Sequence, residues 1–305
     1  MYHPSDPTPA ELAAGYSSDD DFEFIEVFNA SSSQIDLSSC NFTSGITYTI
    51  PNGTMLAAGS RLIIAKNPDA FAERYSSQGK PVIGPYTGKL SNSGETVTLN
   101  AADASVILTV TYDDGTDWPE DADGDGFSMI NLHPFTGTDH NISSNWSASR
   151  EENGGSGEAD VHTYDSWLSS HPELAAAGMT LETDDFDKDG NSNWMEYVFD
   201  SDPTDGKSVP QTLPSTEEID LGAGADSYFT YRFTRPIAIP NVSYTPQTSA
   251  ILTDNQWISD PATVNAVFHA RIRNGTSETL IYRSKLPTSS NNAYFMRIKA
   301  AKTTP

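Results

Sequence analysis

Cysteine is almost absent from this sequence of 305 residues, because Cys40 is the only one. A single cysteine excludes any disulfide within the chain. Cys40 stands among apolar residues in IDLSSCNFTSG, and we expect it to be a small buried side chain. The lack of disulfides does not place the protein in the cytosol.

Basic side chains are also scarce, since 17 Lys and Arg stand against 42 Asp and Glu, for a net charge of −25. Residues 1–146 carry a net charge of −15 and residues 147–215 carry −12, whereas residues 216–305 carry +2. Such an acidic field repels phosphate backbones and attracts divalent cations, so no nucleic-acid partner is expected. The change of sign indicates that the C-terminal segment is a separate unit.

Long apolar runs and catalytic motifs are missing as well. No apolar stretch approaches the length of about 20 residues that a membrane helix needs, so no membrane insertion is expected. The chain contains no GxSxG, GxxxxGK[ST] or HExxH motif, and its six histidines are scattered. We therefore predict that the protein is not an enzyme, with no catalytic residues and no transition-metal site.

Short alternating runs of Val, Ile, Thr, Tyr and Phe are present instead, and they predict a mainly β protein. Six such runs between residues 22 and 132 favour a β-sandwich, with a short helix at 67–75 that Asn67 caps. Polar, glycine-rich stretches predict linkers. The expected division is a sandwich over 1–146, a linker over 147–162, a helical segment over 163–206, a second linker over 207–227 and a small β-sandwich-like module over 228–305.

The first segment resembles the lamin tail domain of bacterial exported proteins. The resemblance rests on FEFIEVFNASSSQIDLSSCNFTSG, YTIPNGTMLAAGSRLIIAKNPDAF, GPYTGKLSNSGETVTL and YDDGTDWPEDADGDGFSM, in this order between residues 22 and 129. It implies an immunoglobulin-like β-sandwich without an active site. The start, MYHPSDPTPAEL, lacks a signal peptide, and we expect the sequence to be part of a longer exported protein.

The segment DFDKDGNSNWMEYVFDSDP, at 185–203, resembles calcium modules near the C-termini of bacterial exoproteins, which are similar to EF-hands and thrombospondin type 3 repeats. The C-terminal unit resembles the small β module that often follows such calcium modules. The resemblance rests on its final strand, which contains YFMRIKA at 294–300.

The loop itself has the residue types that calcium requires, because calcium takes six to eight oxygen ligands at flexible geometry. Gly190 permits the sharp turn, with a positive φ angle, and Glu196, at the twelfth position, can bind through both carboxylate oxygens. The predicted ligands are Asp185, Asp187, Asp189, Asn191, Asn193 and Glu196. Without a cation the close carboxylates would repel one another by a few kcal/mol per pair. The alternative interpretation is a solvated acidic loop that binds no metal.

A second acidic run, DWPEDADGDGFS, places Asp121, Asp123 and Asp125 at alternate positions. It lacks a later bidentate Glu, and the lamin tail resemblance implies that it is a turn before a strand. Both a second calcium site and a simple turn stay open at this point.

These observations predict a non-enzymatic binding or scaffold module that is extracellular or on the cell surface of a bacterium. A structural calcium ion would rigidify the link between two β domains, and the partner would be a protein or polysaccharide. The alternative is an accessory region of a larger secreted enzyme that binds its substrate or a glycan.

Overall fold

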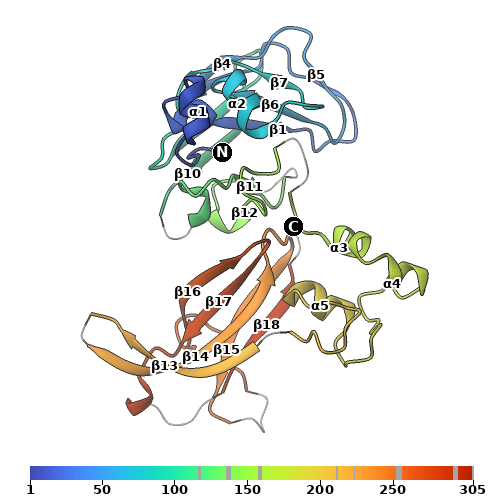
Figure 1. Ribbon diagram of the computed structural model, residues 1–305, viewed down its shortest axis with the longest axis vertical. Helices are drawn as coiled ribbons and strands as arrows, with labels where there is room; N and C mark the ends of the chain where they lie inside the picture. Colours follow the sequence, from blue (N-terminus) through green and yellow to red (C-terminus); the bar gives the residue numbers. More distant parts are fainter. Residues whose placement is uncertain are drawn as a thin grey trace. The chain divides into compact units, whose positions relative to one another are not determined.

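The computed structural model describes residues 1–115, 118–134, 139–156, 160–210, 212–222, 224–251, 256–290 and 295–303. The chain forms two compact units, Met1–Val161 and His162–Pro305. Both consist mainly of β-strands with a few short helices, so the prediction of a mainly β protein is confirmed (Figure 1). Among the described residues, no helix has the length and apolar character needed to cross a membrane.

The first unit is built around two main sheets. One has three strands in the order β1-β6-β7 and the other has five in the order β10-β9-β3-β4-β8. The strand bounds are β1 Phe24–Phe28, β3 Asn41–Ser44, β4 Ile46–Thr49, β6 Arg61–Ala65, β7 Val82–Ile83, β8 Thr87–Gly88, β9 Glu95–Asn100 and β10 Val106–Tyr112.

Strand β6 has apolar side chains on both faces because a core lies on each side of it. Leu62 and Ile64 face a core that also contains Phe42, from the five-stranded sheet. Ile63 belongs to a second core with Phe71, from helix α2 (Pro68–Tyr75). A strand covered on both faces needs a continuous apolar run, and RLIIA supplies one.

The sequence predicted helix α2 and its start correctly. Asn67 accepts hydrogen bonds from the backbone amides of Asp69, at 3.2 Å, and Ala70, at 3.3 Å, and Pro68 takes the first helical position. The cap places Phe71 and Tyr75 on the face that packs against β1 and β6. Cys40 is 5% exposed, in the core between the two sheets, as predicted.

Two buried carboxylates of the first unit, Glu11 and Glu23, receive hydrogen bonds from the protein, although Oε1 of Glu23 has no partner among the described residues. Glu11, in helix α1 (Pro9–Ala14), receives hydrogen bonds of 2.8 Å from both Nε and Nη2 of Arg74, and the Arg74 guanidinium covers the ring of Phe22 at 3.4 Å. Burial raises the pKa of Glu23 to about 7, although the Tyr86 hydroxyl and the Leu90 amide donate to Oε2.

The remaining parts of the first unit are small. The paired strands are β2 (Ile35–Asp36) with β5 (Met55–Leu56) and β11 (Met129–Asn131) with β12 (Trp146–Ala148). Short 3₁₀ helices are η1 (Asp19–Phe22), η2 (Glu120–Ala122) and η3 (Ser143–Asn145).

The second unit contains a four-stranded sheet in the order β13-β14-β17-β16 and a two-stranded sheet of β15 and β18. Their bounds are β13 Thr212–Asp220, β14 Ala225–Pro236, β15 Val242–Ser249, β16 Val267–Asn274, β17 Ser277–Arg283 and β18 Phe295–Lys302. Three short helices precede the strands, and a 3₁₀ turn, η4, follows β17: α3 Tyr164–Ser170, α4 Pro172–Ala176, α5 Asn193–Phe199 and η4 Thr288–Ser290.

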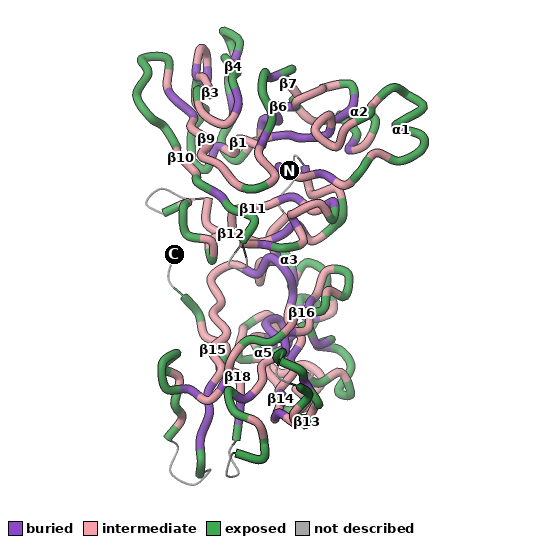
Figure 2. The backbone as a smooth tube through the Cα atoms, turned by 90° about the vertical axis from the view of Figure 1, so that its left-hand side faces the viewer, coloured by how far each residue is buried: buried purple, intermediate pink, exposed green. Residues whose placement is uncertain are grey.

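The helices and the strands of this unit share one hydrophobic core. Trp167 of α3, Leu174 of α4 and Phe199 of α5 pack in one cluster with Phe233 of β14 and Leu280 of β17. Figure 2 shows the buried backbone that runs through α5 and the neighbouring strands. The helical segment is therefore part of the second unit, where we had expected a separate connector between two β domains.

The expected linkers also differ from the structure. Residues 207–227 contain β13 and the first residues of β14, because the polar sequence TLPSTEEID forms an edge strand that is exposed over most of its length. The predicted linker over 147–162 contains the end of β12, and its residues 157–159 lie outside the described residues.

We expect Arg74→Ala to lower the free energy of unfolding of the first unit by about 3 kcal/mol at pH 7, because it leaves the buried Glu11 carboxylate without its cation. The hydrogen bonds from Arg74 lower the pKa of Glu11 to about 2. The stabilisation is therefore full above the ordinary glutamate pKa, about 4.5, and is lost as the pH falls toward 2. Urea unfolding of the wild type and of Arg74→Ala at several pH values between 7 and 2 measures this difference in the free energy of unfolding.

The matched control is Lys89→Ala, which removes a largely exposed pair with Asp20. We expect it to lower the free energy of unfolding much less than Arg74→Ala does, because solvent screens an exposed ion pair. Equal losses for the two variants would contradict the importance of the buried pair.

Candidate metal centre

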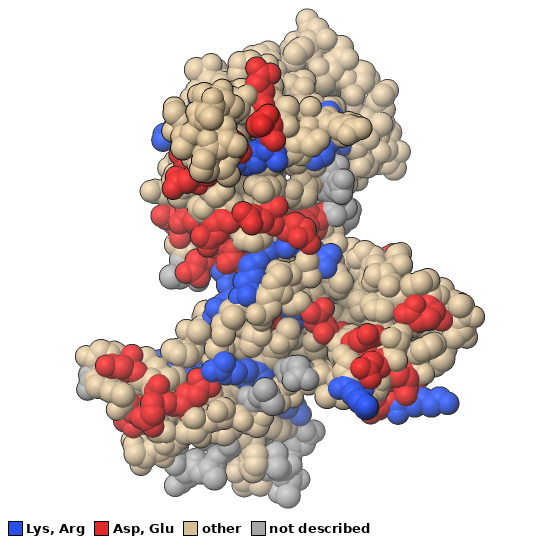
Figure 3. Space-filling model, viewed as in Figure 1, with Lys and Arg blue, Asp and Glu red and all other residues tan. Residues whose placement is uncertain are grey.

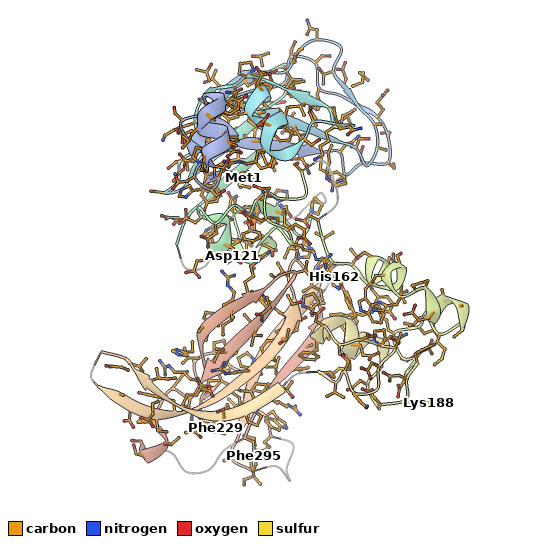
Figure 4. The ribbon with its side chains drawn as sticks, viewed as in Figure 1. Met1, Asp121, His162, Lys188, Phe229 and Phe295 are labelled. Carbon is orange, nitrogen blue, oxygen red and sulfur yellow. The ribbon has the colours of Figure 1, made fainter. Side chains whose placement is uncertain are left out.

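The acidic loop begins after α4 and is closed by backbone hydrogen bonds at its base. The amide of Asn193 donates to the carbonyl of Asp184 at 2.7 Å, and the amide of Trp194 donates to the carbonyl of Glu182 at 3.0 Å. These bonds bring the start of α5 back against the segment that enters the loop. Lys188 marks the loop in Figure 4.

Within the loop, each aspartate turns the chain by accepting backbone amides. Asp185 accepts from Lys188 and Gly190, Asp187 accepts from Asp189, and Asp189 accepts from Asn191. Gly190 has a φ of +95°, which confirms the positive φ predicted for it.

The three aspartates converge in space. One carboxylate oxygen of each of Asp185, Asp187 and Asp189 lies within 4.8 Å of the other two, and all three residues are half-buried. Among the described residues, this is the group of His, Cys, Asp or Glu side chains that reaches such proximity. Figure 3 shows acidic side chains gathered over the loop between α4 and α5.

Glu196 and Asn193 supply further oxygens from the first turn of α5, and both residues are 0% exposed. The amide nitrogen of Asn193 donates to the carbonyls of Met179 and Leu181, which fixes the orientation of the amide group. In the described part of the chain, neither Oδ1 of Asn193 nor either carboxylate oxygen of Glu196 has a hydrogen-bond partner, and the same holds for Oδ2 of Asp187.

These four buried oxygens are the main anomaly of the second unit. A buried acceptor without a donor costs about 1–3 kcal/mol, and a buried charge costs more. Burial raises the pKa of Glu196 to about 8, and the charges of Asp187 and Asp189 contribute to the shift. Burial likewise raises the pKa of Asp187. The arrangement therefore favours a positive charge placed among these oxygens.

The donor set fits a hard cation. Carboxylate and amide oxygens are the ligands of calcium and magnesium, whereas copper, nickel and zinc sites use nitrogen or sulfur ligands. Of the six predicted ligands, Asp185, Asp187 and Asp189 form the converging group. Glu196 is not part of that group, but it lies near enough for the aspartate charges to raise its pKa, and Asn193 is buried at the base of the loop. Asn191 is half-buried next to them, and its side-chain amide donates to Asp189 at 2.9 Å.

Several contacts that hold the loop against the strands could not be read from the sequence. Lys302, in β18, donates to both carboxylate oxygens of Glu182 at 2.6 Å and lies 5.0 Å from the ring centre of Trp194. The hydroxyl of Tyr244, in β15, donates to the carbonyl of Val198 at 2.6 Å. These partners are distant in sequence and belong to no motif, so only the fold reveals them.

The second acidic run has a different geometry. Asp123 lies 2.5 Å from Nδ1 of His3 and pairs with that residue in an isolated β-bridge, and the amide of Gly124 donates to the carbonyl of His3. Among the described residues, Asp121, Asp123 and Asp125 do not form a converging group of the kind found in the loop. This geometry is that of a turn held by the N-terminal segment, in the first unit, where Figure 4 labels Asp121.

Comparison with known families concerns the first unit. Residues 6–114 match the family model of the Lamin Tail Domain. The lamin tail domain is an immunoglobulin-like fold, in agreement with the two facing sheets around Leu62 and Ile64. The match confirms the lamin tail resemblance over these residues, and it ends well before the acidic loop. The comparisons with curated proteins and with solved structures gave no match.

We expect the stability of the second unit to depend on pH when a chelator is present. A raised pKa of about 8 for Glu196 means that the folded state prefers the protonated carboxyl. This contribution is full below the ordinary pKa, about 4.5, and is lost as the pH rises through 8. In chelator, Glu196→Gln should raise the thermal midpoint at pH 8 and leave it nearly unchanged at pH 5.

The control is Glu218→Gln, at an exposed position of β13. In thermal unfolding followed by circular dichroism, Glu218→Gln should change the thermal midpoint by the same amount at pH 5 and at pH 8. A Glu196→Gln variant that behaves in the same way would contradict the buried position of that carboxylate.

Proposed function

We propose that the protein is a non-enzymatic binding or scaffold module of an exported bacterial protein, in which a calcium ion stabilises the second unit. The loop from Asp185 to Glu196 would hold the ion. The four buried oxygens of Asp187, Asn193 and Glu196 that lack hydrogen bonds within the described residues are the observation that carries this proposal.

Calcium is favoured over other hard cations by the shape of the loop. Calcium accepts six to eight oxygens at 2.3–2.6 Å with flexible geometry, and a glutamate at the twelfth position can bind it through both oxygens. Magnesium requires a nearly ideal octahedron and retains several waters. A site with two buried, unpartnered oxygens on Glu196 and one on Asn193 suits the larger ion, which uses more protein ligands.

The ion would act on the fold through α5. Glu196 is followed directly by Tyr197, Val198 and Phe199, which are 3%, 0% and 4% exposed and belong to the core of the second unit. Neutralising the loop would therefore fix the helix that carries these side chains. This role places the effect of calcium inside the second unit, a narrower role than the rigid link between two β domains that the sequence led us to expect.

The module would work in a calcium-rich extracellular or cell-surface setting and bind a protein or polysaccharide partner. The lamin tail region and the metal site each have a structural rationale that needs no catalysis. A glycan-binding accessory region would present aromatic side chains for stacking on sugars. The five tryptophans are all half-buried or buried, so we favour the scaffold role.

Calorimetric titration should show one calcium ion bound per chain, and the binding should be lost in Asp187→Ala and Glu196→Ala. An ion that binds only the folded state stabilises it by about 2.7 kcal/mol when its free concentration is one hundred times the Kd. A melting curve with and without chelator measures this gain.

Asp125→Ala is the matched control, because it removes an acid from the other acidic run. It should leave both the heat of binding and the melting shift unchanged. The calcium proposal would fail if the wild-type protein gave no heat and no shift, or if Asp187→Ala bound as well as the wild type.

A further inference from the structure

Strand β10 is an open edge of the five-stranded sheet in the first unit. It pairs with β9 on one side, and no described strand pairs with its other side. Three consecutive apolar side chains at its start are exposed: Val106 by 63%, Ile107 by 51% and Leu108 by 38%. Figure 2 shows the exposed stretch of β10. The strand VILTVTY contains no charged residue and no proline.

Such an edge is unusual, because proteins normally protect their edge strands with charges, prolines or very short strands. The opposite edge of the same sheet, β8, has only two residues. Strand β13, at the edge of the four-stranded sheet, carries Glu217, Glu218 and Asp220. Strand β10 has neither form of protection over its seven residues, about 20 Å of backbone. Its pairing with β9 has one irregularity, between Val106 and Leu108, and is regular from Leu108 to Tyr112.

One backbone amide on the outer side of β10 is already hydrogen-bonded to a side chain of the same protein. The amide of Thr111 donates to Oδ1 of Asn141 at 2.8 Å, and Nδ2 of Asn141 donates in turn to Oδ1 of Asp139 at 3.0 Å, which holds the side chain in place. Residues two apart in a strand point their amides the same way, so the amide and carbonyl of Thr109 also face outward. Asn141 thus covers one end of the edge, and no strand of the described residues pairs with the outward backbone around Thr109.

The charges at the two ends of β10 indicate which kind of segment can pair with this strand. Asp103 precedes the strand, and Asp113 and Asp114 follow it, and all three are exposed. A second copy of β10 placed antiparallel would bring these acids together at both ends, and like charges there disfavour pairing. A segment with basic residues at its ends would instead pair with them.

We infer that β10 binds an extended segment of a partner protein, which adds as an outer strand to the sheet. The segment has alternating apolar residues at its centre and Lys or Arg at both ends. Backbone hydrogen bonds to the Thr109 region provide affinity, Val106, Ile107 and Leu108 provide apolar contacts, and the flanking aspartates select the basic ends. This site is independent of the metal centre.

The probe is a fluorescein-labelled peptide, Lys-Val-Thr-Val-Thr-Val-Lys, titrated with the full chain and followed by anisotropy. Ile107→Lys places a charge on an exposed edge position and should weaken binding at least tenfold. Thr109→Pro removes an outward amide and should have a similar effect. Met55→Lys, at an apolar residue of β5 that is 48% exposed, is the matched control and should bind as the wild type does.

A peptide with Asp in place of both Lys residues should bind at least tenfold more weakly, and chelator should change neither affinity. Hydrogen exchange should show protection of the Thr109 amide when the Lys peptide is bound. The inference is overturned if the Lys peptide does not bind at about 1 mM, if Ile107→Lys binds as tightly as Met55→Lys, or if the two peptides bind equally. Sedimentation that shows a dimer lost in Ile107→Lys would replace the partner segment with a second copy.

Discussion

The stability of the second unit depends on what neutralises the buried oxygens of Asn193 and Glu196, in the first turn of α5. This helix has only seven residues, too few to be stable alone in water, so its contacts must hold it. Its first turn places Asn193 and Glu196, both 0% exposed, at the acidic loop, and the residues that follow, Val198 and Phe199, belong to the core. The two parts cannot be formed independently, because they are separated by less than two helical turns. A cation in the loop would therefore stabilise the loop and the core together.

The two units differ in the partners that their buried carboxylates have within the protein. In the first unit, Arg74 neutralises Glu11, and the Tyr86 hydroxyl and the Leu90 amide donate to Oε2 of Glu23, whose Oε1 has no partner among the described residues. In the loop of the second unit, the described residues form no ion pair with Asp187 or Glu196, and the donors to the three aspartates are backbone amides and the side-chain amide of Asn191. Glu11 thus has a cation within the chain, whereas the loop of the second unit has an electrostatic cost that an ion from solution would remove.

Local features were predictable from the sequence where a local cause decides them. Asn67 and Pro68 start a helix because they satisfy its first amides, and Gly190 has a positive φ because the loop turns sharply there. The convergence of Asp185, Asp187 and Asp189 agrees with the loop pattern of alternate aspartates, Gly190 and Glu196. Alternate spacing alone does not produce it, because Asp121, Asp123 and Asp125 form no such group among the described residues. The mainly β character follows from the alternating runs, and the lamin tail match covers residues 6–114.

Features that depend on distant contacts were not predictable. The polar stretch TLPSTEEID looked like a linker, yet β13 forms because it pairs along its length with β14. The helical segment looked like a connector, yet Trp167 and Phe199 pack on Phe233 and Leu280, which lie far along the chain. The contact of Lys302 with Glu182 spans 120 residues. No local pattern marks these pairs, since only tertiary packing brings them together.

Amide hydrogen exchange with and without calcium tests most directly whether the ion and the core of the second unit form one cooperative structure. The account predicts that calcium slows exchange in α5, β14 and β15 together with the loop, and leaves β1, β6 and β9 unchanged. Slowed exchange confined to residues 181–196, or no change at all, would contradict it.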